Sequence, residues 1–359
     1  MTNTARQNVT TPSIHCDYYQ YARAVGQYPN DGIGDFLGAV SDGDGSGPQN
    51  MMLHQEVSEL NDISKMFYLN PIRTGNISFN IPQTTTHLTT KYNLGKDAVN
   101  SLFLLNHNLG SKGISFDVNQ IDDQGNETDD GLMIQETNAI NYNSGGALVY
   151  DGWSKVELDS YFEPAATNLK LSFENMNNNT NWPLLIHAIS YGMIFDFPHS
   201  PNLNLSMRKE YDVSQQTTIN GQSIRHINWS MPPKWSSGEP WGLHEGSEDA
   251  FLRRSGRRIW DLTFSHISES DMMADYEMMN FNNLPDGHGY EDFLETSAFF
   301  PLFMQYTMGG NLPFIFMPQG RAELNLDNYA ICILDQKSIN ITQSSFQTYD
   351  IKLKIKEVR

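Results

Sequence analysis

Two acidic stretches contain the residues that could bind a cation. Asp42, Asp44 and Ser46 are spaced like the first oxygen ligands of a calcium-binding loop. Such a loop needs a bidentate glutamate at its twelfth position, which is Leu53 here. The second stretch, 122–130, could hold a cation at a subunit contact or form a solvated hairpin. Because the strongest ligand is missing from the loop, we predict no metal site.

The histidines, cysteines and serines form no motif for zinc binding or nucleophilic catalysis. The chain has 10 histidines and 2 cysteines, but it contains no His-Glu-x-x-His, Cys-x-x-Cys or Gly-x-Ser-x-Gly sequence. The glycine-rich nucleotide-binding motifs are also absent. Cys332 lies in an apolar run, where a buried free thiol is expected. We therefore predict that the chain is not an enzyme, that it uses no cofactor, and that it has no pocket of activated side chains.

The composition favours an acidic β-protein. The 359 residues carry a formal net charge of −19, which repels phosphate backbones and argues against nucleic acid as a partner. Only 18% of the residues are charged, so uncharged polar residues must cover much of the surface. The N-terminal residues do not resemble a signal peptide, and no apolar run reaches the ~20 residues that span a bilayer. The expected site of synthesis is the cytoplasm, with no membrane partner.

The chain length predicts two domains preceded by an N-terminal segment. Residues 1–55 show no sustained periodicity and include a Gly- and Asp-rich stretch, which is typical of an arm that orders against a neighbouring subunit or of a flexible tail. We predict a β-sandwich domain over 56–200 and a second β-domain over 201–359. The boundary falls at 198–202, where two prolines disfavour a central strand.

Short apolar runs at regular intervals predict an all-β fold of antiparallel strands. The expected strands in the first domain lie at 76–81, 102–105, 114–118, 169–173 and 184–195. Those in the second domain lie at 257–264, 312–317, 330–334 and 349–357. In the last strand, lysines alternate with inward-facing Ile351, Leu353 and Ile355, so it reads as an open edge protected by charge.

The C-terminal half also carries a helix signal. Ser268 followed by Asp271 resembles an N-cap and predicts a helix over about 269–279, and a second helix near 289–306 is conceivable. We therefore expect a second β-sandwich or barrel packed against a helix.

Two groups of motifs carry a resemblance to tail-associated structural proteins of tailed bacteriophages. The stretch 105–110, the strand 169–173 and the run 188–195 are similar to a β-sandwich found in such proteins, although Asn106 stands where that family has a glycine. The run 258–264, the following helix, the 309–316 stretch and the closing strand resemble distal-tail and tail-tube-like domains. The resemblance implies a structural role in ring-forming assemblies and no catalytic residues.

Several residues in these motifs are suited to tight turns. Asparagine and glycine tolerate left-handed backbone conformations, and a histidine side chain can hydrogen-bond across a turn. The first predicted turn contains Asn106, His107, Asn108 and Gly110. The second contains Gly309 and Gly310, which allow a reversal before the strand that begins near Pro313.

Two further clusters are candidates for subunit interfaces. Arg253, Arg254, Arg257 and Arg258 could pair with acidic residues of a neighbouring copy, pair locally, or bind a polyanion. Trp229, Trp235 and Trp241 recur every six residues in a loop rich in proline and glycine. This loop could pack on its own domain, anchor a subunit interface, or stack on sugar rings.

The resemblance, the N-terminal segment, the arginine cluster and the lack of catalytic motifs together predict a virion protein that is made in the cytoplasm of a host bacterium. It would be a tail, baseplate or adaptor subunit that contacts copies of itself and neighbouring virion proteins. The alternatives are a tail protein that binds a carbohydrate receptor on the host surface, and a capsid decoration or head-fibre protein. A glycan hydrolase is a more distant alternative, since a pair of carboxylates can always be imagined among 42 acidic residues.

Overall fold

The computed structural model describes residues 9–17, 67–69, 77–82, 101–107, 115–121, 127–132, 152–157, 168–174, 184–210, 212–228, 257–273, 298–321 and 329–357. Nearly all of their regular structure is β-strand, and every strand pairing is antiparallel, so the fold is all-β as predicted. No helix in this part of the chain is long and apolar enough to cross a membrane.

The described elements are seventeen strands and two short helical segments. The strands are β1 (Ser13–Asp17), β2 (Phe67–Leu69), β3 (Ile77–Pro82), β4 (Ser101–His107), β5 (Ser115–Ile121), β6 (Glu127–Leu132), β7 (Gly152–Glu157), β8 (Asn168–Glu174), β9 (Leu184–Asp196), β10 (Ser206–Glu210), β11 (Asp212–Thr217), β12 (Ser223–Asn228), β13 (Arg257–Ser268), β14 (Phe314–Met317), β15 (Ala330–Leu334), β16 (Ile341–Ser345) and β17 (Thr348–Glu357). The helical segments are α5 (Glu269–Met272) and η9 (Phe299–Met304), a π-helix.

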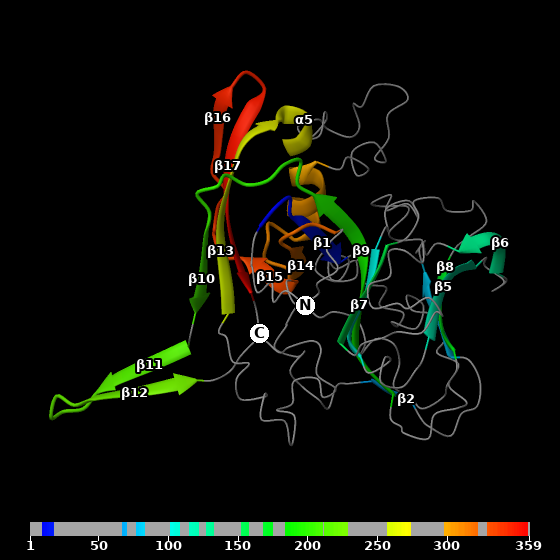
Figure 1. Cartoon of the computed structure of the whole chain (residues 1–359), viewed down its shortest axis with the longest axis horizontal. Helices are drawn as coiled ribbons and strands as arrows, with labels where there is room; N and C mark the ends of the chain where they lie inside the picture. The colour runs from blue at the N-terminus through cyan, green and yellow to red at the C-terminus, as the bar shows by residue number, and fades with distance from the viewer. Residues whose placement is uncertain are drawn as a thin grey trace, which may run out of the picture.

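One eleven-stranded sheet contains most of these strands (Figure 1). Its order is β10-β13-β17-β15-β14-β1-β9-β4-β7, with β16 added beside β17 and β2 beside β9. A second sheet has the order β3-β8-β5-β6, and β11 and β12 form a separate hairpin that projects from the rest of the drawn elements. The large sheet includes strands from all three predicted segments of the chain.

Strand β1 lies in the middle of the large sheet, although it belongs to the segment predicted as an arm. It pairs with β9 on one side and with β14 on the other, so it joins the strands before residue 200 to those after residue 300. All five of its residues are buried. This stretch of the N-terminal segment is therefore an internal strand of the large sheet.

The C-terminal strand shows the predicted alternation but not the predicted edge position. Ile351, Leu353 and Ile355 are buried, and the intervening Lys352 is exposed. The expectation of an open edge was wrong, because β17 pairs with β13 on one side and with β15 and β16 on the other. Two of the lysines instead pair with neighbouring acids, Lys354 with Asp335 and Lys356 with Glu210 at 2.6 Å.

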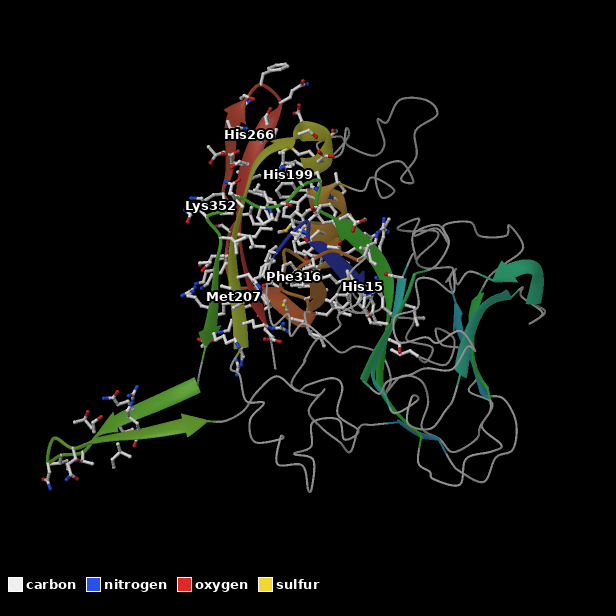
Figure 2. All side chains as sticks on the ribbon, in the orientation of Figure 1. His15, His199, Met207, His266, Phe316 and Lys352 are labelled. Atoms are coloured by element: carbon white, nitrogen blue, oxygen red, sulfur yellow. The ribbon has the colours of Figure 1, made fainter. Side chains whose placement is uncertain are left out.

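An aromatic core fills the space between the sheet and η9. Phe195 and Phe197 of the β9 end contact Phe299 of the π-helix, and Phe303 packs edge-on against Phe314 at 5.1 Å. Figure 2 shows Phe316 among the crowded side chains of this half of the molecule. Burying large aromatic side chains is the main stabilising contribution that such a core can provide.

The helix signal is correct at its start and wrong in its extent. The Ser268 hydroxyl accepts a hydrogen bond from the Asp271 backbone N–H at 3.2 Å, as an N-cap does. The helix ends after one turn, because Met273 adopts an extended conformation with φ −127° and ψ 146°. Of the second predicted helix, 289–306, the described part from residue 298 contains η9, and 289–297 lie outside the described residues.

The two predicted turns differ in outcome. Asn106 and His107 belong to strand β4, where His107 pairs with Ile186 of β9, so the expected turn does not begin at these residues. Asn108 and Gly110 lie outside the described residues. Gly309 and Gly310 have φ values of 73° and 80°, the left-handed conformation, in the turn that precedes β14.

Candidate functional site

A cluster of buried polar side chains lies on one face of the large sheet where β1, β9, β4 and β7 run side by side. Residues that oppose each other in antiparallel strands share a face. The register places Asp17 opposite Gly192, Gly192 opposite Ser101, and Phe103 opposite both Ser190 and Lys155. The alternating side chains Ser13, His15 and Asp17 therefore belong to this face, and Ile14 and Cys16 face the aromatic core.

His15 is the centre of this cluster. Its Nδ1 lies 2.7 Å from the Ser101 hydroxyl, and its Nε2 lies 2.8 Å from the Ser190 hydroxyl. The imidazole also packs against the Phe103 ring, with the ring centroids 4.7 Å apart. His15, Ser101 and Ser190 are all 0% exposed. Figure 2 shows His15 on the side of the core that faces β9 and β7.

The hydrogen bonds around His15 select the tautomer of its neutral imidazole. Ser190 donates its hydroxyl proton to Asp17 Oδ2 at 2.5 Å, so its oxygen must accept a hydrogen bond from His15 Nε2–H. The single proton of the Ser101 hydroxyl has two acceptors within reach, the Gly192 carbonyl oxygen at 3.2 Å and His15 Nδ1 at 2.7 Å, and in the neutral imidazole Nδ1 is the acceptor at the shorter distance. The chain of donors thus runs from Ser101 through His15 and Ser190 to the Asp17 carboxylate.

The surroundings hold this imidazole neutral. Burial and, to a smaller extent, the nearby positive charge of Lys155 together lower the pKa of His15 to about 3. The Lys155 ammonium is itself buried and donates to the Arg321 backbone carbonyl. Burial also raises the pKa of the adjacent Cys16 thiol well above its usual range, with a smaller contribution from Asp17. Neither His15 nor Cys16 is therefore activated for chemistry near neutral pH.

Chemically, the cluster resembles the serine, histidine and aspartate of a hydrolase, but its geometry serves packing. A catalytic serine must reach a substrate, whereas both hydroxyls here are fully buried and each is engaged with His15. A fully satisfied buried network of this kind rigidifies a core and specifies one arrangement of its strands. The cluster therefore pins β1 to β4 and β9.

Sequence reasoning missed this cluster, although a signal was present. The sequence Ser13-Ile-His-Cys-Asp17 alternates polar and apolar residues, as a strand with two different faces does. The run is only five residues long and is isolated from other strands in the sequence. Its partners Ser101 and Ser190 lie 86 and 175 residues away, so no local pattern could have paired them.

We expect His15 to make the folded state less stable in acid. Its pKa is about 3 in the folded protein and near the ordinary 6.5 when unfolded, so the unfolded chain binds more protons between these values. This contribution is fully present above pH 6.5 and is lost as the pH falls towards 3. The predicted slope is about 1.4 kcal/mol per pH unit, measured by urea unfolding of the wild type and of His15→Gln.

The difference between the two proteins isolates His15 from the other histidines and from the carboxylates. An unchanged slope in His15→Gln would contradict this assignment.

A second buried charged contact involves one of the predicted interface arginines. Arg258 donates from Nε and Nη2 to the two carboxylate oxygens of Glu357, at 3.0 and 2.8 Å. Its Nη2 also donates to the Tyr329 carbonyl at 2.7 Å, and its guanidinium lies 5.2 Å from the centre of the Trp260 ring. The exposed fractions of the two charged side chains are 10% and 7%. Arg258 therefore pairs with an acid of its own chain, which is one of the three alternatives predicted for the arginine cluster.

The other predicted site residues are placed only in part. Arg257 begins β13, half-buried and opposite Glu210 of β10. Two arginines and the three tryptophans lie outside the described residues: Arg253, Arg254, Trp229, Trp235 and Trp241. Both acidic stretches lie wholly or largely outside them as well, and among the residues that the structure describes no three His, Cys, Asp or Glu side chains gather into a possible metal site.

Comparisons of the chain with protein-family models, with curated proteins and with solved structures find no match.

Proposed function

We propose that this chain is a structural subunit of a tailed bacteriophage particle, in the tail or baseplate, and that it assembles with copies of itself and with neighbouring virion proteins. The resemblance of the 105–195 and 258–357 motifs to tail-associated domains supports the kind of particle. The distribution of exposed apolar side chains on the surface supports the multimeric role.

Large apolar side chains are exposed on two hairpins. The turn between β11 and β12 carries Ile219, which is 106% exposed, and Ile224 follows it in β12. The turn between β16 and β17 carries Phe346, which is 84% exposed. The β11–β12 hairpin projects from the rest of the drawn elements in Figure 1, and the β16–β17 turn lies at one end of the large sheet near α5. Leu203, in the segment before β10, is also fully exposed.

This arrangement is the observation that carries the proposal. These hairpins present both apolar side chains and strand edges, which proteins usually protect unless another chain covers them. Burying a leucine, isoleucine or phenylalanine side chain contributes ~1.5–3 kcal/mol. A few such residues on each copy would therefore stabilise repeated contacts in a ring or sheath.

Assembly should depend on the two hairpin tips. We expect the double variant Ile219→Ser with Phe346→Ser to shift the protein from multimers towards monomers in light scattering, because each change removes apolar area from the contact. The matched control is Gln216→Ser with Gln343→Ser, which changes exposed polar residues on the same two hairpins. A double variant that stays as multimeric as this control would refute a role for the tips.

The location in the particle requires a separate test. Mass spectrometry of purified particles should detect the chain, and electron microscopy with a labelled chain should place it in the tail or baseplate. Absence from the purified particle would overturn the proposal.

A further inference from the structure

β1 fills the space between β9 and β14 in the large sheet, and we call this space the slot. Both strands that form the slot lie far from β1 in the sequence. β9 begins at residue 184 and β14 at residue 314, and β1 pairs with β9 along its whole length and with β14 over its first three residues. Outside β1, the Thr10 backbone N–H donates to the Pro318 carbonyl at 3.0 Å, and the Phe197 N–H donates to the Pro12 carbonyl at 3.1 Å. Without β1, the sheet would be split between β9 and β14, with two buried edges left unpaired.

The slot also recognises β1 through its side chains. Ser13 donates to Asp196 at 2.5 Å, His15 bridges Ser101 and Ser190, and Asp17 accepts from Ser190. A shift of one residue would place Ile14 and Cys16 against these polar groups and leave several of them without partners. Since an unsatisfied buried polar group costs about 1–3 kcal/mol, the slot is selective for this segment in this register.

The covalent connection of β1 permits a neighbouring copy to provide it. Residues 18–66 separate β1 from the next described strand, β2. A chain of that length spans at most ~160 Å when fully extended. A folded chain of this size has a radius of gyration of roughly 20 Å. The β1 strand of one copy can therefore reach the slot of an adjacent copy.

We infer that β1 is exchanged between neighbouring copies in the assembly, so that the slot of each subunit is filled by the N-terminal strand of another. This inference rests on the proposed multimeric function. The contacts of β1 are identical whichever chain provides it, so the balance depends on concentration. A tethered strand has an effective concentration in the millimolar range, and copies held side by side by their hairpins present each other's strands at comparable concentrations. The pairing and side-chain contacts of the exchanged strands then connect neighbouring copies.

A cross-link between Ser13 and Asp196 tests the exchange in the full-length chain. The hydrogen bond from Phe197 N–H to the Pro12 carbonyl makes Ser13 and Asp196 a non-hydrogen-bonded pair, with Cα atoms ~4.5 Å apart. That separation is compatible with a disulfide. The two native cysteines, Cys16 and Cys332, are buried and should not interfere.

Two differently tagged chains, Ser13→Cys and Asp196→Cys, are produced in the same cell, so that strands select their slots during folding. The purified protein is then treated with oxidised glutathione. Exchange predicts disulfide-linked pairs of the two tagged chains, involving about half of the Ser13→Cys chains when equal copies mix at random. The matched control replaces Asp196→Cys with Ser338→Cys, an exposed position outside the slot, and should give few links.

Light scattering on the same samples separates the two proposals. Multimers without links above the Ser338→Cys level would overturn strand exchange and leave the assembly proposal standing. Monomers would overturn both. In either case, intramolecular linkage in the double variant, Ser13→Cys with Asp196→Cys in one chain, would show that each copy retains its own β1.

Discussion

Replacing Gly192 with alanine is expected to destabilise the protein by about 4 kcal/mol or more, the range that only a few specific mechanisms reach. Gly192 lies in β9 opposite Asp17 of β1 and Ser101 of β4. A Cβ atom at this position would overlap the backbone carbonyl oxygen of Cys16. Because the obstacle is backbone, it cannot move aside by changing a rotamer, and β1 would have to separate from β9.

That separation would break several interactions together. The Ser101 hydroxyl contacts the Gly192 carbonyl, and the hydroxyls of Ser101 and Ser190 both hydrogen-bond with His15. Moving β9 away from β1 would therefore also disturb the polar cluster. Urea unfolding of Gly192→Ala measures the loss, and failure of the variant to fold would be its extreme form.

The matched control for this glycine is Gly221→Ala. Gly221 lies in the β11–β12 turn at φ 76°, and a Cβ there would meet no atom within 4 Å. Only the left-handed backbone conformation is penalised, at roughly 1–2 kcal/mol. If the two variants lose the same stability, the close approach of β1 and β9 at Gly192 is not a constraint on the fold.

Alternating or continuous apolar runs in the sequence predicted six of the eleven strands of the large sheet, β4, β9, β13, β14, β15 and β17, and missed the other five. The alternating lysines and apolar residues of 349–357 correspond to β17, and the long run 184–195 corresponds to β9. Strands of this kind are recognisable because one face is buried along their whole length. The all-β class followed from the number and spacing of such runs.

Pairing between distant segments could not be predicted in the same way. Nothing in the local sequence indicates that β1 pairs with β9 and β14, or that Arg258 meets Glu357 99 residues later. The arginine cluster looked like an interface feature because four arginines within six residues stand out against a net charge of −19. The extent of α5 was also unpredictable, because a cap signal identifies where a helix begins and not where tertiary contacts end it.

The second large effect is expected at Glu357. Replacing it with alanine should cost about 3–5 kcal/mol, because the Arg258 guanidinium would remain buried without its carboxylate. The Tyr329 carbonyl and the face of Trp260 remain beside the guanidinium, but neither carries a full negative charge to replace the carboxylate. The control is Asp335→Ala, which removes an ion pair with Lys354 whose members are 39% and 35% exposed. That loss should be below about 1 kcal/mol.

A double variant distinguishes a buried unpaired charge from a simple loss of packing. Arg258→Met with Glu357→Leu removes both charges and keeps apolar volume in their place. Such replacements are often neutral or stabilising, so the double variant should recover most of the stability that Glu357→Ala loses. Urea unfolding of these variants gives the comparison. If the double variant is as unstable as Glu357→Ala, packing around the pair, rather than the uncompensated charge, limits stability at this end of the sheet.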